Sequence, residues 1–147
     1  MSEENKEYTF ENPEYRKTYW HTCSHILAQA VKRLYPEVRI WAVEPENAAI
    51  LSGGGIGTHL QMGIGDGLIP DILDQGIYDD ICVVSDEEAI NEARALAREE
   101  GLLCGVSGGT NVVAARQLAR QLGSGKTVVT LLPDTGERYF STELFED

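Results

Sequence analysis

Apolar residues recur at three- and four-residue steps in the first quarter of the chain. The pattern runs from Tyr15 to Leu34 and has the spacing of one face of a helix. Residues 11–13 (ENP) come before it and are typical of a helix start. Pro36 ends the pattern, because the residue before a proline avoids the helical conformation. We therefore expect a long amphipathic helix from Tyr15 to Tyr35.

Short apolar runs rich in β-branched residues alternate with helical patterns in the rest of the chain. The expected strands are Val38–Glu44, Asp80–Val84, Leu102–Val106 and Thr127–Leu132, and the expected helices are Ala89–Glu100 and Asn111–Leu122. Ser85 and Glu88 form a capping box before the first of these helices, and Gly101 stops it. Alternation of this kind produces parallel sheets covered by helices. The sequence predicts a single α/β domain over residues 1–147, three-layered (αβα), with a mostly parallel sheet of about four strands.

Charge and composition exclude several classes of partner. The net charge is −12, which disfavours nucleic acid and acidic lipid surfaces. No apolar run approaches the roughly 20 residues of a membrane span. The cysteines, Cys23, Cys82 and Cys104, are odd in number and widely spaced, so neither a disulfide framework nor a thiolate metal site is indicated. We expect a cytoplasmic protein without a nucleic-acid or membrane partner.

Two glycine-containing segments are candidates for ligand binding. The stretch from Gly53 to Gly67 holds seven glycines and is expected to be a long loop. Its end, residues 63–67 (GIGDG), lacks every second side chain and would let a flat ligand approach the backbone. Residues 107–109 (SGG) would form a tight turn with a hydroxyl between a strand and a helix. Ligands of α/β sheets sit at such places, although each segment alone also fits a purely structural turn.

The order of these motifs resembles the cysteine synthases, or O-acetylserine sulfhydrylases, which depend on pyridoxal 5′-phosphate (PLP). The similar text reads VEPENAAILSGG, GIGDGLIP, YDDICVVSDEEAINEARALAREEGLLCGVSGG and TVVTLLPDTGERYFSTELFED, and it extends from about Arg39 to Asp147. The resemblance implies the fold of the large PLP-binding domain. It also implies that the Ser107 hydroxyl bonds the pyridine nitrogen of PLP, with Gly63, Ile64 and Gly65 beside the cofactor. A neutral serine at this nitrogen suits elimination of a β-substituent from an amino acid.

Several parts of the family's site are absent from the sequence. The family has a Schiff-base lysine, an asparagine loop for the substrate carboxylate and a Gly-Thr-Gly-Gly-Thr loop for the phosphate. The lysines here are Lys6, Lys17, Lys32 and Lys126, and none lies in the family's lysine motif. Asp66 and Met62 also replace a small residue and a glutamine. We therefore expect poor PLP retention, no catalytic residue in this chain and no turnover by the chain alone.

Residues from about Tyr8 to Val38 resemble the opening of the editing domain of threonyl-tRNA synthetase. In that family an H-x-x-x-H pair joins a Cys-x-x-x-His pair to form a hydrolytic, metal-binding pocket. His21 and His25 have the spacing of the first pair, but no Cys-x-x-x-His occurs here, so we expect no bound metal. The chain then reads as a chimera. A designed or recombined protein, a natural fusion fragment and an error of the gene model all fit this reading.

Three functions follow from these patterns. The leading one is an incomplete cysteine-synthase-like PLP-binding domain that keeps weak affinity for PLP or another small anion. The second is a metal-binding or hydrolytic editing-domain remnant that uses His21 and His25. The third is an interaction or regulatory module that forms homo-oligomers through uncovered sheet edges.

Overall fold

The computed structural model of the chain describes residues 26–69, 71 and 73–145. The chain divides into two compact units. The first comprises residues 1–40 and 70–79, and the second comprises residues 41–69 and 80–147. Each unit is described by itself below.

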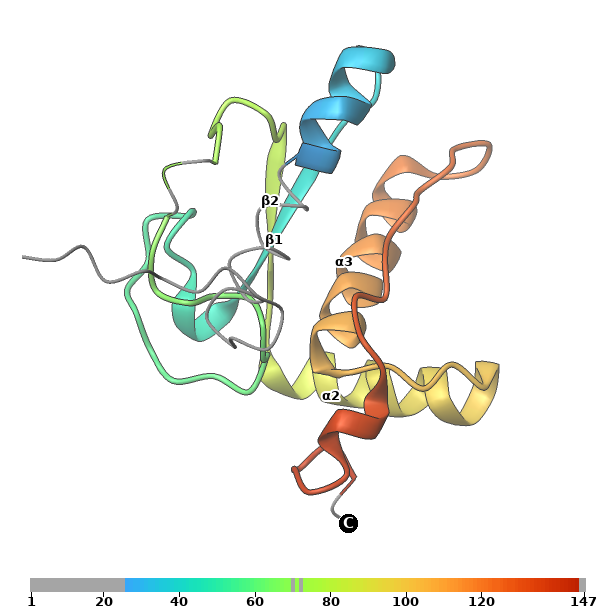
Figure 1. Cartoon of the computed structure of the whole chain (residues 1–147). Helices are drawn as coiled ribbons and strands as arrows, with labels where there is room; N and C mark the ends of the chain where they lie inside the picture. Colours follow the sequence, from blue (N-terminus) through green and yellow to red (C-terminus); the bar gives the residue numbers. More distant parts are fainter. Residues whose placement is uncertain (1–25, 70, 72, 146–147) are drawn as a thin grey trace, which may run out of the picture. The chain divides into compact units, whose positions relative to one another are not determined.

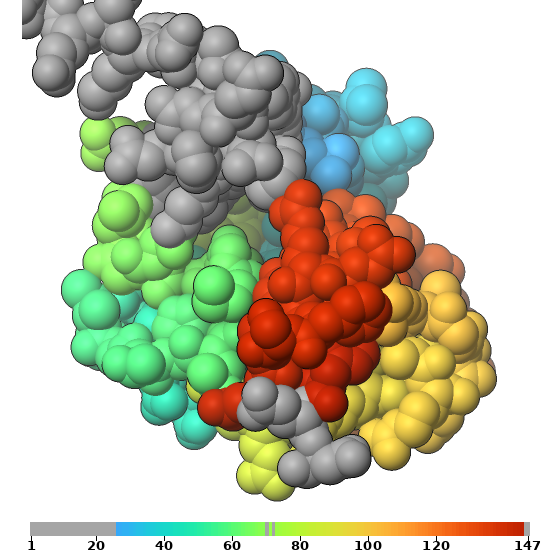
Figure 2. All heavy atoms as spheres, turned by 60° about the horizontal axis from the view of Figure 1, so that its bottom comes forward, coloured from blue at the N-terminus to red at the C-terminus, as the bar shows by residue number. Residues whose placement is uncertain are grey.

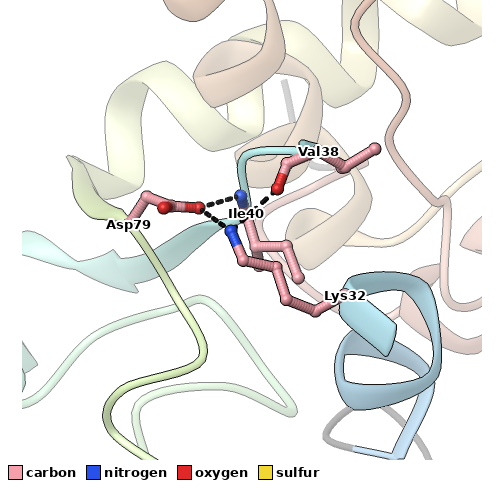
Figure 3. Close-up of polar contacts among 4 residues, drawn as sticks. All are labelled: Lys32, Val38, Ile40 and Asp79. Carbon is pink, nitrogen blue, oxygen red and sulfur yellow. Dashed lines mark hydrogen bonds and ion pairs between the residues drawn. The ribbon is translucent and has the colours of Figure 1, made fainter. Parts of the chain in front are cut away.

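In the first unit, residues 26–34 are helical, which confirms the described part of the helix expected from Tyr15 to Tyr35. Lys32 connects this helix to the segments that follow it (Figure 3). Its Nζ donates to the carbonyl of Val38 and to Asp79 Oδ2, both at 2.8 Å. The same carboxylate oxygen accepts the backbone N–H of Ile40 at 2.7 Å. The Lys32 and Ile40 hydrogen bonds lower the pKa of Asp79.

The second unit contains a parallel pair of strands (Figure 1). Strand β1 covers Trp41–Pro45 and strand β2 covers Asp80–Val84, with Trp41 opposite Asp80 and Pro45 opposite Val84. Strand β2 has the predicted bounds, whereas β1 begins three residues after the predicted start at Val38 and ends one residue after Glu44. The single-turn helix η1, Glu46–Ala48, follows β1 and leads into the glycine-rich loop. The α/β class and the parallel pairing are therefore confirmed.

Two helices pack beside these strands. Helix α2 covers Asp86–Ala95 and continues as the π-helical turn η2, Leu96–Glu100. The capping box of Ser85 and Glu88 forms as predicted, and Gly101 ends the element at φ 68°. Helix α3 covers Val106–Leu122. The core between these elements consists of Cys82, Val84, Ala89, Ala93, Leu96, Cys104, Val106, Ala114, Tyr139 and Leu144.

Helices α2 and α3 contact each other closely. Arg116 of α3 donates to both carboxylate oxygens of Glu92 in α2, at 2.8 and 2.9 Å. Farther along α3, Gln117 accepts the Cys82 thiol hydrogen at 3.1 Å and so connects the helix to β2. Burial is the main reason that the pKa of the Cys82 thiol is raised.

Two of the four predicted strands do not form in the part of the chain that the structure describes. Residues 102–106 hold one antiparallel bridge, between Cys104 and Thr135, and residues 127–132 hold no strand. The latter segment runs beside α3 (Figure 1), where Asn111 Nδ2 donates to the carbonyl of Leu131 at 3.0 Å. The described sheet therefore has two strands, β1 and β2, instead of about four.

Among the described residues, no helix combines the length and the apolar character that crossing a membrane would require. The last element of the second unit is the short helix η3, Gly136–Tyr139.

Candidate functional site

The glycine loop, residues 59–67, takes a backbone conformation that other residues rarely adopt. Gly63 has φ 91° and Gly65 has φ 69°. A Cβ on Gly65 would lie 2.6 Å from Pro45 Cγ, so the loop packs directly on the end of β1 at this point. A Cβ on Gly63 would meet nothing within 4 Å. The backbone at Gly63 therefore faces open space, while Ile64 between the two glycines is half-buried.

Ser107 lies in the first turn of α3, which corrects the prediction that residues 107–109 form a turn before a helix. The N-cap is Gly105, and α3 begins at Val106 instead of Asn111. Ser107 is 4% exposed. Its hydroxyl makes no hydrogen bond to any described residue. Ser107 Oγ is not among the described side-chain atoms that are fully buried without a partner, so the oxygen stays partly accessible and is available to a ligand.

Gln61 connects the glycine loop to three other elements. Its Nε2 donates to the carbonyl of Val84, at the end of β2, and to Asp86 Oδ1, at the start of α2, both at 2.9 Å. Its Oε1 accepts the hydroxyl hydrogen of Thr110, one turn beyond Ser107 in α3, also at 2.9 Å. These bonds hold the glycine loop beside the turn that carries Ser107.

His59 braces the inside of the same loop. Its Nδ1 lies 3.2 Å from the backbone nitrogen of Gln61, and its Nε2 lies 3.0 Å from the carbonyl oxygen of Gly65. Before the loop, the buried Glu44 carboxylate accepts the backbone N–H groups of Leu51 and Ser52, at 2.8 and 2.9 Å. Hydrogen bonds to polar side chains thus fix both the glycine loop and the segment that precedes it.

The C-terminal segment covers the other side of the α3 N-terminus. Tyr139 donates its phenolic hydrogen to Asp134 Oδ2, while Asp134 Oδ1 is buried and has no described partner. Burial and this carboxylate raise the pKa of Tyr139. The segment is also joined to α2, because Arg94 Nε donates to the carbonyl of Leu144 at 2.9 Å. Figure 2 shows the segment (red) on the surface beside α2 (yellow).

The predicted site residues are thus partly assembled. Gly63, Ile64 and Gly65 lie in one loop, and that loop is joined through Gln61 to the helix that carries Ser107. Sequence reasoning missed Gln61, whose only local signal was a polar side chain two residues before Gly63. Asp66 and Met62, the two departures from the family pattern, are both exposed.

The described residues bring together no group of three or more His, Cys, Asp or Glu side chains that could hold a metal. His21 and His25 lie outside the described residues. Cys104 is buried and its pKa is raised, mainly by burial, which makes the thiol a poor nucleophile at neutral pH.

Comparison with known proteins shows similarity to one group of enzymes. The chain is 47% identical over 119 residues to cysteine synthase of Staphylococcus aureus, which covers 81% of this chain and 38% of that protein. The chain therefore spans well under half the length of the curated relatives it matches.

Solved structures give the same result. Cysteine synthase from Entamoeba histolytica superimposes with a TM-score of 0.78 at 38% identity, covering 81% of this chain and 36% of that one. O-ureido-L-serine synthase gives 0.78 at 39% identity, covering 81% and 38%. An O-acetylserine dependent cystathionine beta-synthase from Helicobacter pylori gives 0.76 at 39% identity, covering 81% and 39%.

The family "Pyridoxal-phosphate dependent enzyme" matches residues 27–134. The match begins before Arg39, where the resemblance to cysteine synthases was predicted to start. None of the similar proteins points to a threonyl-tRNA synthetase-like segment. Because the family match covers more than half of the chain, the chain belongs to the family of pyridoxal-phosphate dependent enzymes, and it is similar to cysteine synthases.

Proposed function

We propose that this chain supplies the ring-facing wall of a PLP site of the cysteine synthase kind and that the chain alone does not turn over substrate. The observation that carries the proposal is the position of Ser107, which is 4% exposed in the first turn of α3 and whose hydroxyl makes no hydrogen bond to a described residue. A serine hydroxyl can donate to an unprotonated pyridine nitrogen. The family match supports PLP as the source of that nitrogen.

The glycine loop fits the flat face of such a ring. Gly63 carries no side chain, and a Cβ added to it would meet nothing within 4 Å, which leaves room for the face of a ring. Ile64 follows it and offers an apolar contact. When bound, PLP supplies an electron sink for bond cleavage at the α-carbon of an amino acid. The residues of this chain would orient the ring and leave its nitrogen unprotonated.

The positions of the lysines support the second claim of the proposal, that the chain alone does not turn over substrate. Lys32 is held by Asp79 at 2.8 Å, and Lys126 is exposed in the turn after α3. Lys6 and Lys17 lie outside the described residues, and neither lies in the family's lysine motif. Without that lysine and the phosphate loop, binding relies on weak contacts, and the chain alone should retain PLP or a similar small anion poorly.

Ring binding can be measured with 4-deoxypyridoxine 5′-phosphate, which has the ring and phosphate of PLP but no aldehyde to react with amines. We expect weak, saturable binding by equilibrium dialysis and a 2- to 10-fold lower affinity for Ser107→Ala, about the value of one hydrogen bond. Ser124→Ala, at an exposed serine after α3, is the matched control and should bind like the parent. Equal affinities for Ser107→Ala and the parent would refute the ring-facing role of Ser107.

The claim of no turnover depends on the absence of a Schiff-base lysine, and that absence has its own experiment. The protein is incubated with PLP, reduced with borohydride and digested, and the peptides are mapped by mass spectrometry. We expect scattered, substoichiometric labelling of amines. Stoichiometric labelling of a single lysine would contradict the claim.

The chimeric origin, the cytoplasmic location and self-association through sheet edges remain predictions from the sequence. No observation favours hydrolysis or metal binding at His21 and His25 over the PLP-ring site.

A further inference from the structure

Gln61 is buried completely, with 0% of its surface exposed, whereas the other residues of the glycine loop are exposed or half-buried. An amide is costly to bury unless it is hydrogen-bonded. Here both hydrogens of Nε2 are used, by the carbonyl of Val84 and by Asp86 Oδ1, and Oε1 accepts from Thr110. The side chain therefore has one defined orientation.

The partners of Gln61 fix the backbone of the loop as well as its side chain. Asp86 Oδ1 accepts from the Gln61 amide, and Asp86 Oδ2 accepts the backbone N–H of Leu60 at 2.9 Å. One carboxylate at the start of α2 therefore binds two successive residues of the loop. Gly63 follows Gln61 by only two residues, so little chain remains between the fixed point and the glycines.

Thr110 extends the connection to the predicted ligand-binding turn. Its hydroxyl lies 2.9 Å from Gln61 Oε1 and 3.1 Å from the carbonyl of Val106, the first residue of α3. Thr110 is 0% exposed and lies three residues after Ser107, a separation that places both on neighbouring positions of one helix face. The Gln61–Thr110 bond thus spans from the glycine loop to the turn that carries Ser107.

We propose that Gln61, acting through Thr110, is a positioning residue that aligns the glycine loop with Ser107, so that both contact the same bound ring. This inference rests on the proposed PLP-ring site. Gln61 touches no ligand in this scheme. Glutamate cannot replace it, because a carboxylate would face the carbonyl of Val84 and the Asp86 carboxylate, both acceptors.

The test compares two glutamines of the same unit. Gln61→Met keeps much of the side-chain volume and removes the hydrogen bonds. Gln117→Met does the same on α3. Gln117 accepts a hydrogen bond from the Cys82 thiol and, among the described residues, makes no hydrogen bond to the glycine loop. We expect both variants to unfold at lower urea concentration. Only Gln61→Met should weaken binding of 4-deoxypyridoxine 5′-phosphate, by about tenfold.

A double-mutant cycle separates positioning from general loss of stability. In the Ser107→Ala background, Gln61→Met should weaken binding by a smaller factor, because the hydroxyl that the loop is aligned with is already gone. Thr110→Val leaves the Gln61 bonds to Val84 and Asp86 in place and should reproduce part of the loss of binding affinity. This variant replaces Gln61→Met in the test if Gln61→Met does not fold.

The outcomes distinguish this inference from the proposed function. If Ser107→Ala weakens binding but Gln61→Met and Thr110→Val do not, Gln61 has only a structural role and the inference is wrong. Additive effects in the cycle would overturn it as well. If Ser107→Ala binds like the parent, the proposed function itself fails.

Discussion

Gly109 of α3 lies directly against the backbone of Ala89 in α2. A Cβ built on Gly109 would lie 2.0 Å from the Ala89 carbonyl oxygen and 3.0 Å from the Ala93 Cβ. The two helices therefore approach each other at a point where no other residue fits, and this approach carries the first turn of α3 into the core.

Gly109→Ala should lower the free energy of unfolding by about 3 kcal/mol, because the added methyl forces the two helices apart. Urea unfolding followed by circular dichroism measures the loss. Gly55→Ala is the control, since a Cβ at Gly55 meets nothing within 4 Å and its φ is not in the left-handed region. A Gly109→Ala variant as stable as Gly55→Ala would contradict the close packing.

Lys32→Met should reduce stability by about 0.5 kcal/mol at pH 7, the usual range for a partly exposed ion pair. The hydrogen bond from Lys32 lowers the pKa of Asp79. Its contribution is therefore complete above the pKa of unfolded aspartate, about 4, and is lost as the pH falls through the lower folded-state pKa. Urea unfolding at pH 7 and pH 3 should show the difference between the variant and the parent shrinking at pH 3.

Lys126→Met controls for the loss of one positive charge from an acidic chain, because Lys126 is exposed. If it shows the same pH-dependent loss as Lys32→Met, the effect comes from net charge and not from the bond to Asp79.

Tyr139→Phe should cost about 1–3 kcal/mol at neutral pH, because it leaves the Asp134 carboxylate without the phenol. The raised pKa of Tyr139 means that its contribution is present below about pH 10, the pKa of unfolded tyrosine, and is lost as the pH rises toward the folded-state value. Alkaline unfolding should therefore affect the parent more steeply than Tyr139→Phe.

Tyr35→Phe serves as the comparison, since Tyr35 is 55% exposed. Its unfolding at pH 7 and its alkaline profile should match the parent. A Tyr139→Phe protein with the same alkaline profile as Tyr35→Phe would argue against the buried Tyr139–Asp134 pair.

Gly63→Ala and Gly101→Ala form a matched pair for the ligand-facing surface. Both positions have positive φ, and at both a Cβ would meet nothing within 4 Å. Each substitution should cost about 1–2 kcal/mol of stability through backbone strain. Only Gly63→Ala should also weaken binding of 4-deoxypyridoxine 5′-phosphate. Equal affinities for the two variants would exclude a ligand in front of Gly63.

The sequence predicted the elements whose signals are local. A short apolar run rich in β-branched residues located β2, and the side chains of Ser85 and Glu88 located the start of α2, because cap and strand signals depend on residues close in the chain. It missed the start of α3, because glycines at 108 and 109 are typical of turns. Inside the helix they permit close packing, which depends on a helix far away in the sequence.

The prediction of a strand at residues 127–132 was wrong for a different reason. β-branched residues favour a pleated, half-buried surface, and that preference needs a neighbouring strand to act. Val129 is 83% exposed, and the segment lies beside α3 without a ladder partner among the residues described.

The candidate site was predictable only in part. Gly63, Ile64, Gly65 and Ser107 were found from their order along the chain. Gln61 could not be found in this way, because its partners lie 23, 25 and 49 residues away and no periodicity connects them.

The hydrogen bonds of His59 inside the glycine loop also favour one tautomer of its ring. Because the Gln61 backbone N–H must donate, His59 Nδ1 is the acceptor, and the ring carries its hydrogen on Nε2, which donates to Gly65. Both nitrogens are then occupied. While the loop keeps this shape, the imidazole of His59 serves as a noncovalent crosslink within the loop, with a fixed tautomer.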